Sequence, residues 1–530
     1  MKGKIKIFGF LLILSVLLIS CSTNNDNEIT DKEMTDLVIS EDFNFTTHRD
    51  VEVNLRAFYS GVFYIYDLND NLLKKGLIDI QDGYHGIISI PNDISNVKLV
   101  YSEVEDMEAD YEIINNTIDY NFYPDQEEVR GEVRDEDQVH PILECIEHLG
   151  DGMFLAHYGY LNDYDSVQQI PIGSMNMLQN TPYQDMGQPT LFQPGRHENV
   201  FTVEFPGEGY RDEEIFYIKW KLGGTFGEGF ARADSTSTVC PRGFYDDDDN
   251  DGVLNDDDDF PYDDTRAFLN HYPGDDSLTW GTLAYEDRWP LMGDYDFNDV
   301  IISYRFETVD DPADHLLEVF GYFVLRASGA GYQNGFALEL PFPAENVEEL
   351  TYTDLAGSGV EGVDSQIINF FANALEIMNK PQDSEFVNTQ PSDPYLTPVA
   401  FEFYLKLTEA VDESALPWQL PYNPFIVVDQ NSGREVHLPD MPPTYLADQL
   451  LFGTEDDNSE PGNNRYYKTA TNLPWAINLP IEWDYPKERI AIIDTYNYFG
   501  DWAESSGAVH NDWYENTVDN VVEENIYQTP

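Results

Sequence analysis

The chain has few basic residues, and this shortage limits what it can bind. It contains 28 Lys and Arg against 99 Asp and Glu, which gives a formal net charge of -71 over 530 residues. Because phosphate backbones and anionic lipid headgroups repel such a surface, nucleic acid and acidic membranes are excluded as partners. The charge indicates a solvated acidic surface or, alternatively, a surface suited to cations or to a basic partner.

Cysteine is also scarce, with only Cys21, Cys145 and Cys240 in the chain. If Cys21 is modified, Cys145 and Cys240 remain, and an isolated pair in an oxidising compartment predicts a disulfide. Two buried free thiols are the alternative. The two cysteines lie near the ends of one proposed domain, so a bridge would stabilise it by about 4 kcal/mol through loop closure.

Long apolar runs are missing after the N-terminus, so no later stretch is expected to span a bilayer. Three lysines precede a short apolar segment at residues 7–19, which is typical of a signal peptide. Residues 18–21 (LISC) resemble a bacterial lipobox, in which the cysteine is lipidated. We therefore expect a lipoprotein signal peptide at residues 1–20, lipidation of Cys21 and a flexible acidic tether at residues 21–39.

Familiar catalytic motifs are absent as well. The sequence has no His-Glu-x-x-His zinc helix, no nucleophile elbow and no dinucleotide-binding loop before a helix. The ten histidines are scattered. The chain is therefore expected not to be an enzyme.

The patterns that are present favour strands. Aromatic residues make up 14% of the chain, and helical periodicity is rare. We predict an all-β, multidomain fold that begins with two β-sandwich, Ig-like modules at residues 40–123 and 140–243, joined by a linker at 124–139. An Asp-rich calcium loop at 244–265 and a jelly-roll-like β domain at 266–530 follow.

One helix is expected within that last domain, at residues 365–379. Ser365 can cap its first turn. Apolar residues recur at helical spacing behind it, namely Ile367, Phe370, Phe371, Ala374, Leu375 and Met378.

Eleven of the nineteen residues at positions 246–264 are Asp, and their order is not random. The D-x-D-x-D-G spacing is that of a calcium loop, and so many carboxylates repel one another unless a cation lies among them. The predicted ligands are Asp247, Asp249, Asp251, the Val253 carbonyl, Asn255 and Asp258. We expect structural Ca²⁺ here, which suits a flexible carboxylate loop better than Mg²⁺, and we expect it to fix how the second module meets the third unit.

A second acidic cluster precedes the strand predicted at residues 300–306. Alternating residues of an extended segment point to the same side, so their oxygens could share a cation. The possible ligands are Glu286, Asp287, Asp294, Asp296, Asn298 and Asp299. A turn whose side chains bond backbone donors and a carboxylate pair for glycoside hydrolysis remain as alternatives.

Several of these segments together resemble the LruC-domain family of bacterial lipoproteins. They are DGVLN at 251–255, LAYED at 283–287, GDYDFND at 293–299, FVLRA at 323–327 and GREVHLP at 433–439. The resemblance implies an exported lipoprotein of the outer membrane or cell surface of a Gram-negative bacterium, often with β-sandwich modules in front and with no established activity. The calcium loop also resembles a thrombospondin type-3 repeat, and the second module resembles β-sandwich modules of adhesin-like proteins.

These observations predict a calcium-stabilised, lipid-anchored surface protein that binds a glycan or another protein without catalysis. Its membrane contact would be the lipid on Cys21. The alternatives are a hydrolase of extracellular polymers that uses the carboxylates of residues 294–299, and a structural scaffold of the envelope. Four tryptophans could stack on sugars, although each also suits a core: Trp280, Trp289, Trp418 and Trp513.

Overall fold

The computed structural model describes residues 32–529 except for 58–60, 80–82, 103–106, 123–138, 151, 165, 184, 208–215, 224–227, 241–246, 250, 275–277, 356–358 and 363–364. Within these ranges the fold is all-β and multidomain, as the sequence predicts, with strands in several sheets and a few short helices. The predicted signal peptide and Cys21 lie outside the described residues.

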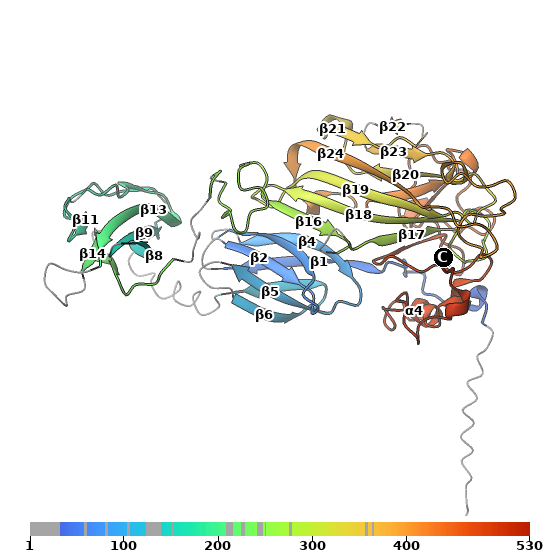
Figure 1. The fold of residues 1–530 in the computed structure, drawn as a ribbon, viewed down its shortest axis with the longest axis horizontal. Coiled ribbons are helices and arrows are strands. Elements are labelled where there is room, and N and C mark those ends of the chain that lie inside the picture. Colours follow the sequence, from blue (N-terminus) through green and yellow to red (C-terminus); the bar gives the residue numbers. More distant parts are fainter. Residues whose placement is uncertain are drawn as a thin grey trace, which may run out of the picture.

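The first sandwich packs a three-stranded sheet on a four-stranded sheet (Figure 1). The strands are β1 (His48–Arg56), β2 (Gly61–Tyr66), β3 (Leu72–Ile78), β4 (Tyr84–Pro91), β5 (Asn96–Ser102), β6 (Met107–Glu112) and β7 (Thr117–Asn121), in the orders β4-β1-β7 and β3-β2-β5-β6. Alternate residues of β1 are fully buried, and Val51 and Val53 share a core with Phe63 of β2. The alternation arises because successive side chains of a strand point to opposite faces.

The second sandwich is built in the same way. Its strands are β8 (Val139–Gly150), β9 (Met153–Asn162), β10 (Gln168–Gln169), β11 (Asn176–Gln179), β12 (Leu191–Phe192), β13 (Gly195–Pro206), β14 (Tyr217–Gly223) and β15 (Glu228–Asp234). They form sheets of order β13-β9-β8 and β11-β14-β15 and the small pair β10-β12. Trp220 of β14 is fully buried between the sheets and contacts Tyr158 and Phe201.

The third unit consists of two larger sheets. The strands of the first are β16 (Phe268–Tyr272), β17 (Gly281–Tyr285), β18 (Val300–Asp310), β19 (Leu316–Ala327), β21 (Val347–Tyr352), β24 (Val399–Val411) and β27 (Ala476–Leu479). The strands of the second are β20 (Gly335–Leu340), β22 (Gly359–Glu361), β23 (Gln366–Phe371), β25 (Asn423–Val427) and β26 (Glu435–His437). A phenylalanine-rich core, with Phe323, Phe336 and Phe401 at its centre, joins the two sheets.

The helices of the described residues are short. They are α2 (Ala374–Ile377), α3 (Ile492–Thr495) and α4 (Phe499–Glu504), with 3₁₀ turns η1 (Met34–Asp36), η2 (Ala344–Asn346), η3 (Glu413–Ala415), η4 (Val428–Gln430), η5 (Pro461–Asn463) and η6 (Glu523–Asn525).

The helix predicted at residues 365–379 is wrong for its first half. That half forms β23, which pairs with β20 on one side and β22 on the other. Because both faces of β23 are mostly buried, its apolar run is continuous and mimics helical spacing. Only α2 is helical, and its cap is Asn373, whose side chain accepts from Leu375 N and Glu376 N; Ser365 instead donates to Glu339.

The tether predicted at residues 21–39 ends earlier than expected. Met34, Leu37 and Ile39 are buried in a second core of the third unit, together with Phe499 and Trp502 of α4. Figure 1 shows the start of the described chain lying beside α4. The apolar residues spaced through this acidic segment are the reason that it packs instead of extending into solvent.

Candidate metal centres

The aspartates of the predicted calcium loop converge. A carboxylate oxygen from each of Asp247, Asp249 and Asp251 lies within 4.8 Å of the others. Gly252 follows with a φ of 96°, a left-handed conformation that favours glycine and turns the chain sharply. Three carboxylates therefore converge on a sharp turn at Gly252.

The other predicted ligands, Val253, Asn255 and Asp258, differ in whether their oxygens lie near the three converging carboxylates. Asp258 is buried near Asp249, and burial together with that neighbouring charge raises the pKa of Asp258 to about 6. The Asn255 side-chain oxygen instead accepts a hydrogen bond from Asp248 N at 3.0 Å. Val253 N donates to Asp251 Oδ1 at 2.8 Å, which holds the Val253 backbone against the loop.

Several carboxylate oxygens of the loop are buried without compensation. Among the residues that the structure describes, Asp249 Oδ2, Asp251 Oδ2 and Asp258 Oδ2 have no hydrogen-bond partner. Burial and the neighbouring aspartates raise the pKa of Asp251 to about 6. Such carboxylates gain by accepting either protons or a cation, and their oxygens suit Ca²⁺.

The loop docks on the first sandwich. Val253 is 1% exposed and packs with Val62 of β2 and Phe268 of β16. Tyr64 of β2 donates a hydrogen bond of 2.6 Å to Asp257 Oδ1. The loop, which lies in the chain between the second module and the third unit, therefore also packs where the first sandwich meets the third unit, a contact that the sequence did not predict.

We call this contact the junction, and it is formed by β3 and β4 of the first sandwich and by β16 of the third unit. Lys75 of β3 forms an ion pair with Asp259, the residue after the last predicted ligand of the loop. At the other end of the junction lies a cavity of about 620 Å³, lined by His48, Tyr272 and Trp418, among other residues. Strand β16 connects the two features, since Phe268 lies under the loop and Tyr272 lines the cavity.

The tryptophans differ in their exposure. Trp289 and Trp513 are fully buried, as core residues are. Trp418 and Trp280 are partly exposed, and the Arg305 guanidinium lies 5.5 Å from the Trp280 ring. Trp418 also lines the cavity at the junction.

The second acidic cluster also converges. A carboxylate oxygen from each of Glu286, Asp294 and Asp296 lies within 4.8 Å of the others. Burial and the charges of its neighbours raise the pKa of Asp296 to about 7 and raise that of Glu286 well above its usual value. Asp294 alone is exposed, so the cluster has one side open to solvent.

The backbone of this cluster is not the extended strand that the sequence suggests. Tyr295 and Phe297 have φ values of 59° and 51° and are buried in the second core. The alternation is kept, with aromatic rings toward the core and the carboxylates of Asp294 and Asp296 toward Glu286. Left-handed conformations at bulky residues persist only where the surrounding packing holds them.

Two predicted ligands of the second site form a network beside it. Asp299 Oδ2 accepts from Asp287 N at 2.7 Å, and Asp287 Oδ2 accepts from the Asn334 amide at 2.8 Å. Arg434 donates to the Asp287 carbonyl oxygen at 3.1 Å. Asp287 and Asp299 are therefore placed to organise the turn through hydrogen bonds.

Sequence reasoning missed Glu488. Its pKa is raised to about 8, first by burial and then by the charges of Asp296 and Asp294, so it lies close to the cluster. No local pattern connects Glu488 to residues almost two hundred positions earlier. The side-chain oxygens of Asn298 and Glu488 both lie beside Gly329. A Cβ built on Gly329 would meet Asn298 Oδ1 at 2.0 Å and Glu488 Oε2 at 2.4 Å.

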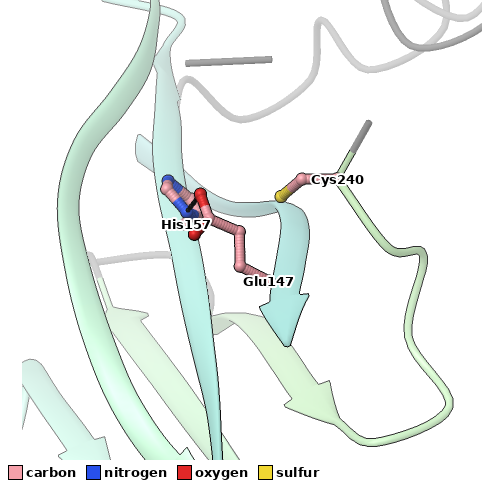
Figure 2. A group of neighbouring side chains, drawn as sticks. All are labelled: Glu147, His157 and Cys240. Carbon is pink, nitrogen blue, oxygen red and sulfur yellow. Dashed lines mark ion pairs between the residues drawn. The ribbon is translucent and has the colours of Figure 1, made fainter. Parts of the chain in front are cut away.

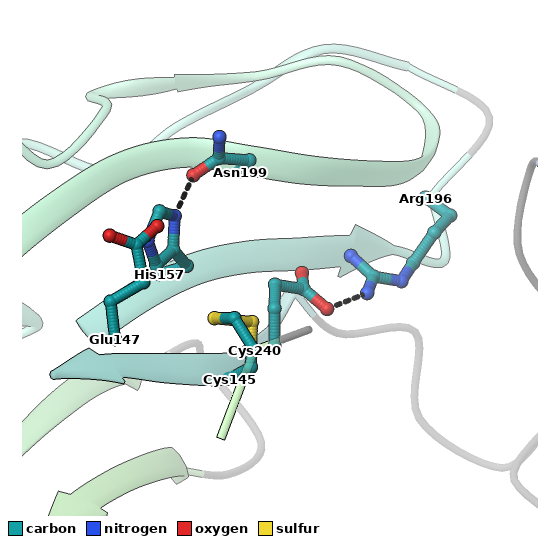
Figure 3. Close-up of a disulfide and its surroundings, with 7 residues drawn as sticks. Cys145, Glu147, His157, Arg196, Asn199 and Cys240 are labelled. Atoms are coloured by element: carbon teal, nitrogen blue, oxygen red, sulfur yellow. Dashed lines mark hydrogen bonds and ion pairs between the residues drawn. A yellow bond between two sulfur atoms is a disulfide. The ribbon is translucent and has the colours of Figure 1, made fainter. Parts of the chain in front are cut away.

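A third group of potential ligands is explained by other bonds. Glu147, His157 and Cys240 lie together (Figure 2). Cys240 forms a disulfide with Cys145, so its sulfur is not a thiolate ligand (Figure 3). His157 forms an ion pair with Glu147 at 2.8 Å and a hydrogen bond with Asn199 at 2.8 Å. This group is a structural network of the second sandwich.

The fold and the two acidic clusters define an all-β, multidomain protein with two potential cation sites. Residues 314–514 match a protein family described as a domain of unknown function, DUF4842. Among solved structures, the chain is similar to a candidate lipoprotein from Bacteroides ovatus, with a TM-score of 0.40 and 16% identity, covering 59% of this chain and 90% of that chain. No curated protein matches the chain. In the described ranges, no helix is long and apolar enough to cross a membrane.

Proposed function

We propose that the protein is a calcium-stabilised, lipid-anchored protein of the LruC-domain kind, located in the outer membrane or at the cell surface, which binds a glycan or another protein without catalysis. The observation that carries this proposal is the position of the acidic loop. Its buried, unneutralised carboxylates are built into the junction, so a cation bound there would hold the first sandwich on the third unit.

The cavity at the same junction supports the binding role. It is walled by residues of both units, and pockets that bind small ligands occur preferentially at domain interfaces. Trp418 offers an aromatic face, while Arg49 and Asp50 of β1 and Gln419 offer polar groups. Aromatic faces with a few polar groups suit a carbohydrate.

Burial of the second cluster argues against a hydrolase. Glu286 and Asp296 are 0% and 1% exposed, so a polymer has no room between them. Glycosidases need two carboxyl groups about 5–10 Å apart that flank an accessible bond. We therefore propose that these carboxylates are not catalytic.

Anchoring rests on the sequence of the N-terminus. The lipobox-like residues 18–21 favour a lipid on Cys21, and the described chain begins at Lys32. Such a lipid would precede in the chain the segment that packs on α4. The net charge of -71 is consistent with a surface that attracts cations and does not bind nucleic acid.

The first test is thermal unfolding of the protein without its signal peptide and lipid, in millimolar Ca²⁺, in millimolar Mg²⁺ and in excess chelator. The proposal requires a higher melting temperature in Ca²⁺, with a smaller shift in Mg²⁺. The same melting temperature in Ca²⁺ and in chelator would contradict it.

The second test separates binding from scaffolding. An array of bacterial and host polysaccharides and matrix proteins is probed with the wild type and with Trp418→Ala, in Ca²⁺ and in chelator. Trp280→Ala is the matched control, because Trp280 is also a partly exposed tryptophan of the third unit. Calcium-dependent binding that only Trp418→Ala removes supports the proposal, whereas no binding by the wild type favours an envelope scaffold.

A further inference from the structure

In the part of the chain that the structure describes, two buried oxygens of the second acidic cluster have no hydrogen-bond partner. Glu286 Oε1 accepts from Phe297 N at 2.8 Å, which leaves Oε2, and within the described residues Oε2 has no hydrogen-bond partner. Asn298 Nδ2 donates to the Pro486 carbonyl oxygen at 3.1 Å, which fixes the amide so that Oδ1 faces the cluster. This Oδ1 is likewise without a hydrogen-bond partner in the described part of the chain.

Both residues are fully buried, at 0% exposure. A buried acceptor without a hydrogen bond is unfavourable, and more so when the group is charged. Such atoms beside a group of carboxylates therefore indicate a ligand that satisfies them.

Two glycines keep open the space that these oxygens occupy. A Cβ on Gly293 would lie 1.6 Å from Glu286 Oε2. A Cβ on Gly329 would lie 2.0 Å from Asn298 Oδ1 and 2.4 Å from Glu488 Oε2. The site is therefore shaped by the backbone on two sides, and not only by a crowd of acidic side chains.

Neighbouring side chains of the described residues bring little positive charge to the cluster. Four carboxylates gather there, and the nearest described cation is the guanidinium of Arg489, 4.0 Å from Glu488. The Arg489 side chain is 59% exposed and pairs at 2.8 Å with Glu385. Arg489 contributes its backbone to the site, since its N–H donates to Asp296 Oδ2 at 2.6 Å.

We infer that Glu286, Asp294, Asp296, Asn298 and Glu488 form a second calcium centre, separate from the loop at the junction. The donor set contains only oxygens and no His or Cys, which favours Ca²⁺ over transition metals. Five residues from a turn and a distant segment suit the six to eight ligands of Ca²⁺ better than the strict octahedron of Mg²⁺. Asp294 is exposed and borders a cavity of about 490 Å³, so water can complete the shell from that side.

The ion would tie together parts of the chain that are far apart in sequence. Glu286 follows β17, Asp294 to Asn298 precede β18, and Glu488 belongs to the C-terminal segment that leads into α3 and α4. The N-terminal residues 32–35 line the same cavity as Asp294 and pack on that segment. The second centre would therefore fix the place where the chain leaves the third unit toward its N-terminus.

The sharpest test replaces a glycine instead of a ligand. A Cβ at Gly329 meets the ends of two ligand side chains, Asn298 and Glu488, so Gly329→Ala should affect calcium binding more than the fold, which is compared by melting temperature in chelator. Calcium binding at this centre should weaken by at least about tenfold, since misplaced ligands cost 10–100-fold in affinity. Gly331→Ala is the matched control, because a Cβ there meets nothing within 4 Å.

The readouts are calcium stoichiometry by equilibrium dialysis and affinity by calorimetry, on the full mature chain. The inference requires that Gly329→Ala, and independently Glu286→Gln, lose one ion that Gly331→Ala and the wild type retain. Equal stoichiometry and affinity in all four proteins would overturn it.

Asp251→Asn keeps this test separate from the proposed function. If Asp251→Asn binds the same number of ions as the wild type while Gly329→Ala loses one, the loop at the junction does not bind calcium and the second centre does. If Asp251→Asn loses an ion and Gly329→Ala does not, the loop binds calcium and the second centre does not.

Discussion

Lys74 of β3 lies 2.9 Å from Asp310 of β18, and both side chains are buried, at 6% and 0% exposure. The same ammonium group lies 2.9 Å from Asp314 and 4.0 Å from Glu413. Tyr84 of β4 donates to Asp314 at 2.7 Å. A single cation of the first sandwich is therefore held by three carboxyl groups of the third unit, in the middle of the junction.

The first prediction concerns the removal of this cation. Lys74→Met should destabilise the protein by about 3–5 kcal/mol, because buried carboxylates are left without their partner. The control is Lys98→Met, which breaks an exposed ion pair with Asp70 and should change stability little. Chemical denaturation of both variants measures the difference. Equal effects would contradict the view that the junction depends on Lys74.

The second prediction concerns pH. Burial and the Asp310 charge raise the pKa of Glu413 to about 8 against a usual value near 4.5. The folded state then holds a proton that the unfolded state lacks, so the stability from Glu413 is full below pH 4.5 and falls as pH rises to 8.

Glu413→Gln cannot lose this proton. Its stability relative to the wild type should increase as pH rises from 5 to 8, by at most about 1.4 kcal/mol per pH unit. Glu409→Gln, an exposed substitution on β24, is the control and should follow the wild-type curve. Parallel curves for Glu413→Gln and the wild type would show that Glu413 does not titrate in this range.

Local patterns predicted the features that depend on neighbouring residues. The all-β fold follows from the aromatic content and the rare helical periodicity, and the spacing of Asp247, Asp249 and Asp251 placed three carboxylates at one point. The error at residues 365–379 has the same origin. A strand buried on both faces has no alternation, so its apolar residues fit a helix equally well.

Features that depend on tertiary packing could not be predicted from the sequence. Glu488 joins Asp296 across the fold, and nothing near Glu488 marks it as a ligand. The junction was missed for a similar reason. Val253 was expected only to give a carbonyl, but its side chain packs on Val62. Such contacts depend on which surfaces meet, and one sequence does not contain that information locally.

The third prediction concerns the calcium loop. Asp251→Asn should lower the calcium affinity of the loop and make the junction more sensitive to protease, because a carboxylate with a buried, unpaired oxygen is lost. Asp264→Asn, an exposed substitution in the same segment but not at a predicted ligand, carries the same charge change and serves as the control. Limited proteolysis in Ca²⁺ and in chelator reports the effect. Unchanged cleavage of Asp251→Asn would argue against a clamp.

The fourth prediction concerns the disulfide. Cys145 and Cys240 are 95 positions apart, and removal of so long a cross-link should destabilise the second sandwich by about 4 kcal/mol. The double variant Cys145→Ser with Cys240→Ser should therefore unfold this sandwich at a lower temperature. Hydrogen exchange of β9 and β14 reports on the second sandwich, and exchange of β18 and β19 is the internal control. Loss of protection in β18 and β19 as well would mean that the second sandwich and the third unit unfold together.

The last prediction concerns the N-terminal segment. Phe45 is 2% exposed, and its ring lies 5.9 Å from that of Trp502 and 6.5 Å from that of Phe499. Phe45→Ala should cost about 3–5 kcal/mol, as for other buried aromatic residues, and should release the segment from α4. Val38→Ala is the control in the same segment, because Val38 is 79% exposed and should tolerate the change. Denaturant unfolding gives the free energy, and protease cleavage before residue 46 reports the release. If both variants resist protease as the wild type does, other contacts hold the segment. The first of these to test is the hydrogen bond of 2.9 Å from Val38 N to the Glu504 carboxylate.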